Sequence, residues 1–287
     1  RMDLNDLEQK LKTGKIGTVV ATLGTTGLGA VDPLAEIIPL ARQYGARVHV
    51  DTAYGGFFTL IREDLDADAA RHYSAIADSD SVVVDPHKHG LQPYGCGAVF
   101  FRDRSIGRFY KHDSPYTYFA SEDLHFGEIQ LECSRAGASA AALWATLKVF
   151  PLTGDGLGAV LRAGRNAATK WFELIQASDC LVALQKPELD IVTYFPNLHS
   201  LEEIDHVSQE LFQRSAAPER TEQIHLATYV MKHSGFAKRG FDIPKNSARD
   251  SARIMRSVLM KPEQENWIPD LHSHVENLTR SIIKELK

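Results

Sequence analysis

A lysine stands just beyond a short apolar run that is expected to form a buried strand. Lys88 follows Ser81–Val84 after the three residues Asp85, Pro86 and His87. A buried ammonium group is costly unless it is paired or neutral, and a neutral lysine amine is a nucleophile that condenses with aldehydes. A lysine that leaves the strand end for solvent is the commoner case, so Lys88 alone leaves both roles open.

An aspartate occupies the equivalent place beyond a second apolar run. Asp51 follows Val48–Val50. Ligands of open α/β sheets bind beyond the carboxyl ends of the strands, so Asp51 and Lys88 are expected to face one crevice. Enzymes that use pyridoxal phosphate need such a pair, because the lysine holds the aldehyde as an imine and the aspartate keeps the pyridine nitrogen protonated. A turn or helix-cap role for Asp51 is the structural alternative.

A glycine-rich segment, Thr22–Gly29, lies at the end of the first apolar run, Ile16–Leu23. Its hydroxyls can hydrogen-bond a cofactor's phenolic oxygen or a substrate carboxylate. The segment matches neither G-x-G-x-x-G nor the P-loop pattern, so neither a dinucleotide nor a nucleoside triphosphate site is indicated. His87 and His89 would share a face of an extended segment, but no carboxylate or cysteine completes a metal site, and no metal is predicted.

Together, these segments resemble the group II pyridoxal phosphate-dependent amino-acid decarboxylases. The resemblance rests on Gly24-Thr25-Thr26, on residues 49–56 and on Asp85-Pro86-His87-Lys88, in this order. Residues 85–94 and 134–144 are most similar to bacterial tyrosine decarboxylases. The resemblance implies an α/β fold of the fold-type I transferase kind, with part of a large domain built on a mostly parallel sheet and a small C-terminal α+β domain.

The resemblance also implies roles for single residues around the cofactor, pyridoxal 5'-phosphate. Lys88 matches the lysine of the Schiff base, and Asp51 matches the partner of the pyridine nitrogen. Ala53 matches the small residue packed against one face of the ring. Thr25 matches the hydroxyl near the ring oxygen and the substrate.

Two further matches concern the neighbours of the lysine and a loop after it. His87 and Asp85 match residues that approach the phosphate and the lysine, although an anion at position 85 would repel a phosphate. A mobile loop of the family carries a tyrosine that returns a proton to the substrate carbon, for which Tyr118 is the first candidate and Tyr116 the second. A packed aromatic side chain is the alternative for either tyrosine.

The implied reaction is decarboxylation of an L-amino acid to the amine and carbon dioxide. Tyrosine or another aromatic amino acid is the first substrate candidate, with glutamate, aspartate and diaminobutyrate left open. A carbon–carbon lyase resembling sphingosine phosphate lyase and a non-catalytic subunit of a split enzyme are the alternatives. Family members begin well before the equivalent of Arg1, so we expect a fragment or one chain of a split protein. Its partner would be a second copy or a chain that carries the missing N-terminal segment, and the 287 residues alone are expected to bind the cofactor poorly.

The elements that must position these residues follow from the spacing of apolar side chains. Asp32 and Pro33 are expected to cap and begin a helix, and Gly45 to end it. With a strand on either side, this helix forms a βαβ unit of a parallel sheet, which Ser81–Val84 and Ala98–Phe101 extend.

The C-terminal part of the sequence predicts a second set of elements. Helices are expected at 134–144, 156–177, 201–215 and 270–286, and strands at 181–184, 190–195, 225–230 and 253–260. A boundary near Pro151 would divide the chain into residues 1–150, the C-terminal part of the cofactor-binding large domain, and residues 151–287, the small domain.

Composition excludes several classes of partner. The 32 lysines and arginines against 37 aspartates and glutamates give a net charge of −5 without a basic stripe, so nucleic acid is not an expected partner. No apolar run approaches the roughly 20 residues that span a bilayer, so no membrane association is expected. The three cysteines, Cys96, Cys133 and Cys180, fit no disulfide framework, which favours the cytoplasm.

Overall fold

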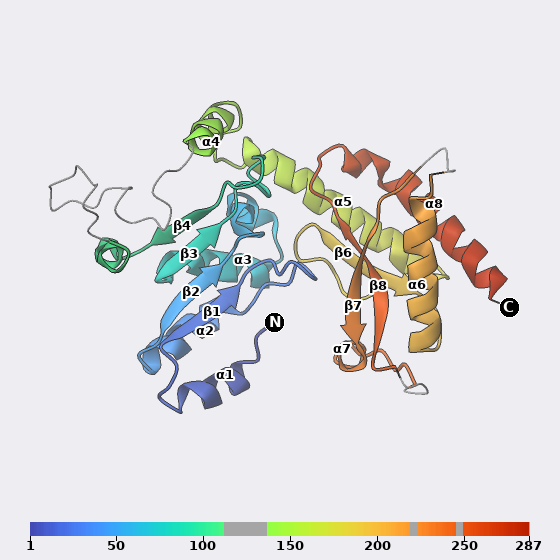
Figure 1. The fold of residues 1–287 in the computed structure, drawn as a ribbon, viewed down its shortest axis with the longest axis horizontal. Coiled ribbons are helices and arrows are strands. Elements are labelled where there is room, and N and C mark those ends of the chain that lie inside the picture. The colour runs from blue at the N-terminus through green and yellow to red at the C-terminus, as the bar shows by residue number, and fades with distance from the viewer. Residues whose placement is uncertain (112–136, 219–222, 245–248, 287) are drawn as a thin grey trace. The chain divides into compact units, whose positions relative to one another are not determined.

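The computed structural model describes residues 1–111, 137–218, 223–244 and 249–286 (Figure 1). The chain separates into two compact units. The first unit comprises Arg1–Leu23, Asp32–Thr59 and Arg71–Leu152. The second comprises Gly24–Val31, Leu60–Ala70 and Thr153–Lys287. No helix in the described ranges is both long enough and apolar enough to cross a membrane.

The first unit is built on a four-stranded sheet in the order β1-β2-β3-β4 (Figure 1). The strands are β1 (Thr18–Thr22), β2 (Arg47–Asp51), β3 (Ser81–Val84) and β4 (Ala98–Phe101). β1, β2 and β3 are parallel, whereas β4 runs antiparallel to β3. Thr22 pairs with Asp51, and Asp51 pairs with Val83, so the carboxyl ends of the three parallel strands meet at one edge.

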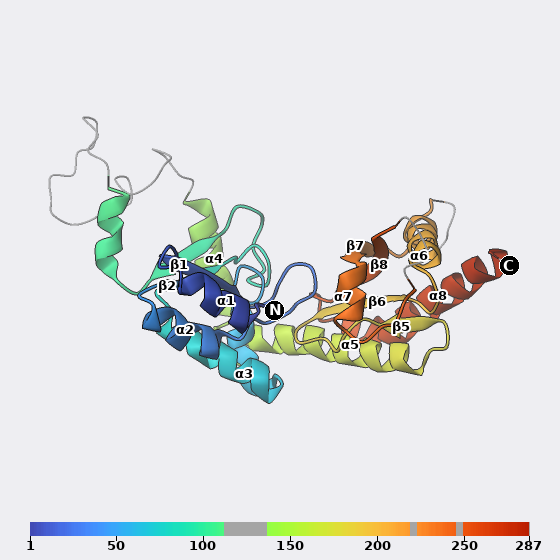
Figure 2. The same cartoon turned by 90° about the horizontal axis from the view of Figure 1, so that it is seen from below.

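Helix α2 (Leu34–Gln43) connects β1 to β2 and lies against one face of this sheet (Figure 2). Its apolar face is buried as predicted, and Gly45 follows it with a φ of +69°, a conformation that favours glycine. The prediction that Asp32 caps α2 is wrong. Its carboxylate instead accepts hydrogen bonds from the backbone N–H groups of Met2 and Thr22, at 2.7 and 2.9 Å.

The remaining helices described before the second sheet begins are mostly short. They are α1 (Leu4–Leu11), η1 (Gly56–Asp64), α3 (Ala67–Ser74), η2 (Ala75–Asp78), η3 (Arg104–Phe109), α4 (Ala138–Val149) and α5 (Leu157–Ala177). α4 continues five residues beyond the predicted end at residue 144, whereas α5 agrees with its prediction to within one residue.

The second unit contains an antiparallel sheet in the order β5-β6-β8-β7. Its strands are β5 (Leu181–Ala183), β6 (Ile191–Pro196), β7 (Ala227–Lys232) and β8 (Ser251–Val258), each within two residues of its prediction. Its other helices are α6 (Leu201–Ser215), α7 (His233–Ala237) and α8 (Gln264–Glu285). α8 begins six residues earlier than predicted, because the buried Ile268 extends its apolar face past Pro269.

Candidate active site

The carboxyl edge of the first sheet is tied together by backbone hydrogen bonds that continue beyond the strands. The Leu23 N–H donates to the Asp51 carbonyl at 3.0 Å, and the Thr52 N–H donates to the Val83 carbonyl at 3.1 Å. The Asp85 N–H then donates to the Ala53 carbonyl at 3.2 Å. The residues that follow β2 and β3 are therefore held side by side by main-chain bonds.

Asp51 reaches this edge with half of its carboxylate engaged. Oδ1 accepts the backbone N–H of Ala53 at 3.1 Å, and within the described residues no donor pairs with Oδ2. The side chain is half-buried. Asp51 can therefore accept a hydrogen bond from a protonated ring nitrogen without breaking a contact of its own.

Lys88 lies in a turn over residues 86–90, directly after β3. Its N–H donates to the Asp85 carbonyl at 2.9 Å, and its Nζ lies 3.0 Å from Asp85 Oδ2. The side chain is 29% exposed, so the amine is partly sheltered and also reachable. The charge is paired, as the cost of burying an ammonium group requires.

His87 lies on the other side of the Asp85 carboxylate. Its Nε2 is 3.7 Å from Asp85 Oδ2, and its Nδ1 is 2.9 Å from the Cys96 carbonyl oxygen. A carbonyl only accepts, so Nδ1 carries the proton. The imidazole also stacks on Tyr94, with ring centroids 5.2 Å apart. Asp85 thus contacts both Lys88 and His87, in keeping with the predicted neighbours of the lysine.

His89 and His87 bind different partners and do not face a common site. The turn directs His89 to the Tyr54 carbonyl oxygen, 2.9 Å from its Nδ1, whereas His87 is held by Cys96. The two histidines would share a face only if residues 87–89 were extended. These residues form a turn instead, so the shared face is not formed. In the described part of the chain, one group of side chains approaches the geometry of a metal site: Asp179, Cys180 and Glu276. There, the Arg280 guanidinium already pairs with both carboxylates.

Thr25 belongs to the second unit, in the segment Gly24–Val31. Its Oγ1 accepts the backbone N–H of Ala30 at 3.0 Å, which closes the glycine-rich turn. Gly27 packs so closely on β7 that an added Cβ would lie 2.7 Å from Tyr229 Cε2. Tyr118 and Tyr116, the candidate proton donors, lie outside the described residues.

Sequence reasoning missed the side chains that hold the segment after Asp51. The hydroxyl of the buried Tyr73 donates to the Gly55 carbonyl at 3.0 Å. An added Cβ on Gly55 would overlap the carbonyl oxygen of Leu23. The paired glycines at 55 and 56 were the available signal, because such glycines mark close approaches of the backbone.

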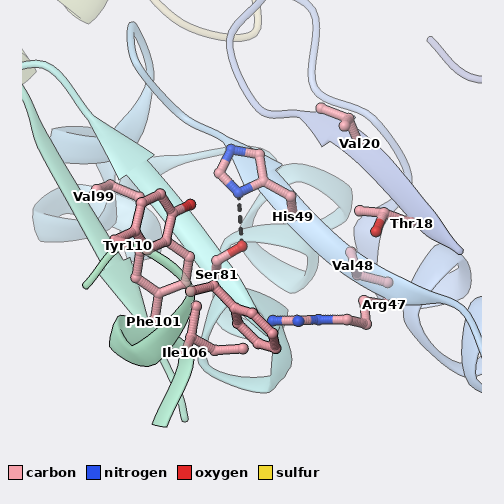
Figure 3. Close-up of a pocket in the computed structure, with 11 residues that line it drawn as sticks. Thr18, Val20, Arg47, Val48, His49, Ser81, Val99, Phe101, Ile106 and Tyr110 are labelled. Atoms are coloured by element: carbon pink, nitrogen blue, oxygen red, sulfur yellow. Dashed lines mark hydrogen bonds between the residues drawn. The ribbon is translucent and has the colours of Figure 1, made fainter. Parts of the chain in front are cut away.

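A hollow of about 710 Å³ lies at the other end of the same sheet (Figure 3). It is lined at the amino ends of the parallel strands by Thr18, Arg47 and Ser81, and on β4 by Phe101. His49 hydrogen-bonds Ser81 there at 2.8 Å. None of the predicted cofactor residues lines this hollow.

Comparison with known proteins agrees with the chemistry of the carboxyl edge. Residues 2–195, about two thirds of the chain, match the family described as the pyridoxal-dependent decarboxylase conserved domain. The chain belongs to this family. This confirms the resemblance inferred from the three sequence segments.

Several curated relatives are amino-acid decarboxylases. L-Tyrosine decarboxylase of Enterococcus faecium is 27% identical over an alignment of 291 residues, and this alignment covers 84% of this chain and 47% of that protein. The probable L-aspartate decarboxylase of Pyrococcus furiosus is 33% identical over 197 residues, covering 67% and 50%. L-2,4-Diaminobutyrate decarboxylase of Acinetobacter baumannii is 30% identical over 237 residues, covering 76% and 44%. The chain spans about half the length of the curated relatives it matches.

Solved structures confirm the expected α/β fold. Oryza sativa TDC with PLP and tryptamine has a TM-score of 0.77 at 19% identity, covering 98% of this chain and 55% of that one. Mouse CSAD has a TM-score of 0.73 at 23% identity, covering 97% and 56%. The chain therefore shares its fold with these two structures.

Proposed function

We propose that the chain carries the reactive edge of a pyridoxal phosphate-dependent decarboxylase that converts an L-amino acid to the amine and carbon dioxide. One observation carries the proposal: Asp51 ends β2 and Lys88 follows the adjacent parallel strand β3, at the edge where ligands of α/β sheets bind.

Pyridoxal phosphate fits the residues present at this edge. Lys88 offers an amine for the aldehyde, and Asp51 Oδ2 offers an acceptor for the ring nitrogen. Ala53 follows Asp51 by two residues, and its single methyl group leaves room for a flat ring. When bound, the cofactor supplies an electron-accepting ring that stabilises the carbanion left by the departing carboxylate.

Separate residues of this chain would then hold or move protons at the site. Asp51 would keep a proton on the ring nitrogen. Asp85 Oδ2 lies 3.0 Å from Lys88 Nζ, so it would take the proton that the ammonium must lose before the amine attacks an aldehyde. His87 Nε2, 3.7 Å from the same carboxylate, would take this proton from Asp85 and release it to solvent, to which the side chain is 18% exposed. We further propose that Thr25 contacts the substrate and that Tyr118 returns the proton to the product carbon.

The substrate we propose first is an aromatic L-amino acid, tyrosine above all. The E. faecium L-tyrosine decarboxylase supports this choice, since its alignment covers more of the chain than those of the aspartate and diaminobutyrate decarboxylases cited above. We also propose a homodimer, or an assembly with a chain that supplies the segment before residue 1, located in the cytoplasm. Residues 1–150 and 151–287 would be its large-domain portion and small domain.

A substrate panel tests the reaction. The full chain, or the assembly it forms, is incubated with pyridoxal phosphate and carboxyl-labelled tyrosine, aspartate, glutamate or 2,4-diaminobutyrate. We expect equal amounts of carbon dioxide and amine from one of them, and none from Lys88→Ala. Lys10→Ala is the matched control, because Lys10 pairs with Asp6 on the exposed face of α1. Release of an aldehyde without carbon dioxide would contradict the proposed decarboxylation and favour the activity of a carbon–carbon lyase.

A further inference from the structure

A buried histidine attaches the turn that carries Lys88 to the segment that follows Asp51. His89 is 4% exposed, and its Nδ1 lies 2.9 Å from the Tyr54 carbonyl oxygen. Because a carbonyl oxygen only accepts, the imidazole is the donor and Nδ1 carries the proton. The bond joins residues 35 positions apart: His89 directly follows Lys88, and Tyr54 directly follows Ala53.

Two aromatic rings fix the orientation of this imidazole. The Tyr54 ring lies 4.6 Å from it at 84°, and the Phe58 ring lies 5.0 Å from it at 73°. Both contacts are edge-to-face, the arrangement that aromatic rings favour. Rotation of the His89 ring away from the Tyr54 carbonyl would break both ring contacts as well as the hydrogen bond.

Both attached segments are closely packed against their neighbours. An added Cβ on Gly90 would lie 2.6 Å from Pro86 Cα and 2.8 Å from Phe57 Cζ, so the turn has no space for a side chain at this position. Gly55, next to Tyr54, lies against the end of β1 in the same way. The His89–Tyr54 bond therefore acts together with this packing and with the backbone bond from Asp85 to Ala53 in setting the position of Lys88 relative to Asp51.

We propose that His89 is a positioning residue, which places the Lys88 amine so that it can bind the aldehyde of pyridoxal phosphate while Asp51 meets the ring nitrogen. This inference rests on the proposed function. His89 acts through its neighbour: in the same turn, the Lys88 amine is directed to Asp85 and the His89 imidazole to Tyr54. Loss of the Nδ1 donor would displace the turn and with it the amine.

The test compares substitutions that separate the donor from the ring. His89→Phe keeps an aromatic ring but removes the donor. His89→Asn places an amide N–H near the position of Nδ1, whereas His89→Gln places it farther out. His233→Phe is the matched control, because His233 also bonds a carbonyl, that of Ile243 at 2.9 Å, but in the second unit.

The full chain, or the assembly it forms, is titrated with pyridoxal phosphate. The absorbance band of the bound cofactor is recorded, and the adduct is fixed with borohydride and located by peptide mass spectrometry. We expect His89→Phe and His89→Gln to bind about tenfold more weakly at Lys88, the factor that one lost buried hydrogen bond commonly represents, with a shifted band. His89→Asn should restore the band and most of the affinity, and His233→Phe should match the wild type. Circular dichroism confirms that each variant is folded.

Three outcomes with the variants would contradict the inference. A folded His89→Phe chain with the wild-type constant and band would overturn it, and so would an equal loss in the His89→Phe and His233→Phe chains. If His89→Phe does not fold, equal behaviour of the Asn and Gln variants would overturn it as well. Absence of the adduct at Lys88 in the wild-type assembly would refute the proposed function itself and the inference with it, before any variant is compared.

Discussion

Replacement of Gly55 by alanine places a methyl group where the segment after β2 meets the end of β1. The added Cβ would overlap the carbonyl oxygen of Leu23 and lie 2.6 Å from Tyr73 Oη. Leu23 cannot yield easily, because its own N–H is bonded to the Asp51 carbonyl at 3.0 Å. The methyl group can be accommodated only if the backbone of the proposed active-site edge moves.

The size of the effect follows from these contacts. Overpacking against a fixed backbone costs about 3 kcal/mol of unfolding free energy. Displacement of Tyr73 would also break its hydrogen bond to the Gly55 carbonyl, for about 1 kcal/mol more. We therefore expect Gly55→Ala to lower the stability of the first unit by about 4 kcal/mol.

Urea unfolding followed by circular dichroism measures this loss. Gly17→Ala is the matched control, because an added Cβ at Gly17 meets nothing within 4 Å and its φ is not in the left-handed region. We expect it to stay within about 0.5 kcal/mol of the wild type. A Gly55→Ala chain whose unfolding midpoint equals that of Gly17→Ala would show that the segment after Asp51 is not held as described.

Three further predictions concern other parts of the chain. Asp51→Asn should leave the unfolding midpoint unchanged and lower kcat/KM at least about 100-fold, and full activity would exclude Asp51 as the partner of the ring nitrogen. Burial lowers the pKa of His272, so the folded chain favours the neutral imidazole; stability should be full above the unfolded value of about 6.5 and fall below it, and urea midpoints at pH 5 and 8 should differ less in His272→Gln. Phe101→Ser should reduce self-association in sedimentation, because Phe101 lines the hollow at the amino ends of the parallel strands and is 37% exposed, whereas Phe212→Ser on α6 should not; equal sedimentation of the two would count against this surface.

The positions of the strands could be predicted because each is short, apolar and bounded by turn residues. The limits of Ser81–Val84 and Ala98–Phe101 were predicted without error. The order of strands around α2 follows from the handedness and parallel pairing of βαβ units. The local sequence pattern was sufficient here because the strand that each segment favours by itself is also the strand that it forms in the sheet.

The side-chain partners could not be predicted, because they come from distant parts of the chain. Asp32 precedes a helix and has the sequence of an N-cap, yet its acceptors are used by Thr22 and by Met2, thirty residues away. His89 is two residues from His87 and would share its face in a strand. The turn from Pro86 to Gly90 directs the two histidines to different partners. Gly90 packs closely against Phe57 in this turn, a contact between distant residues that the local sequence does not show.

Two aspartates of the first unit show how the structure separates a structural carboxylate from an available one. Asp32 is buried, and each of its oxygens accepts a backbone N–H. Asp51 has one oxygen bonded to Ala53, and its other oxygen has no donor in the described ranges. From the sequence, a cap role was expected for Asp32 and was also open for Asp51. Backbone bonds already hold the edge at Thr52 and Asp85, so Asp51 is not needed as a structural anchor, and its second oxygen remains open to a ligand that donates a proton.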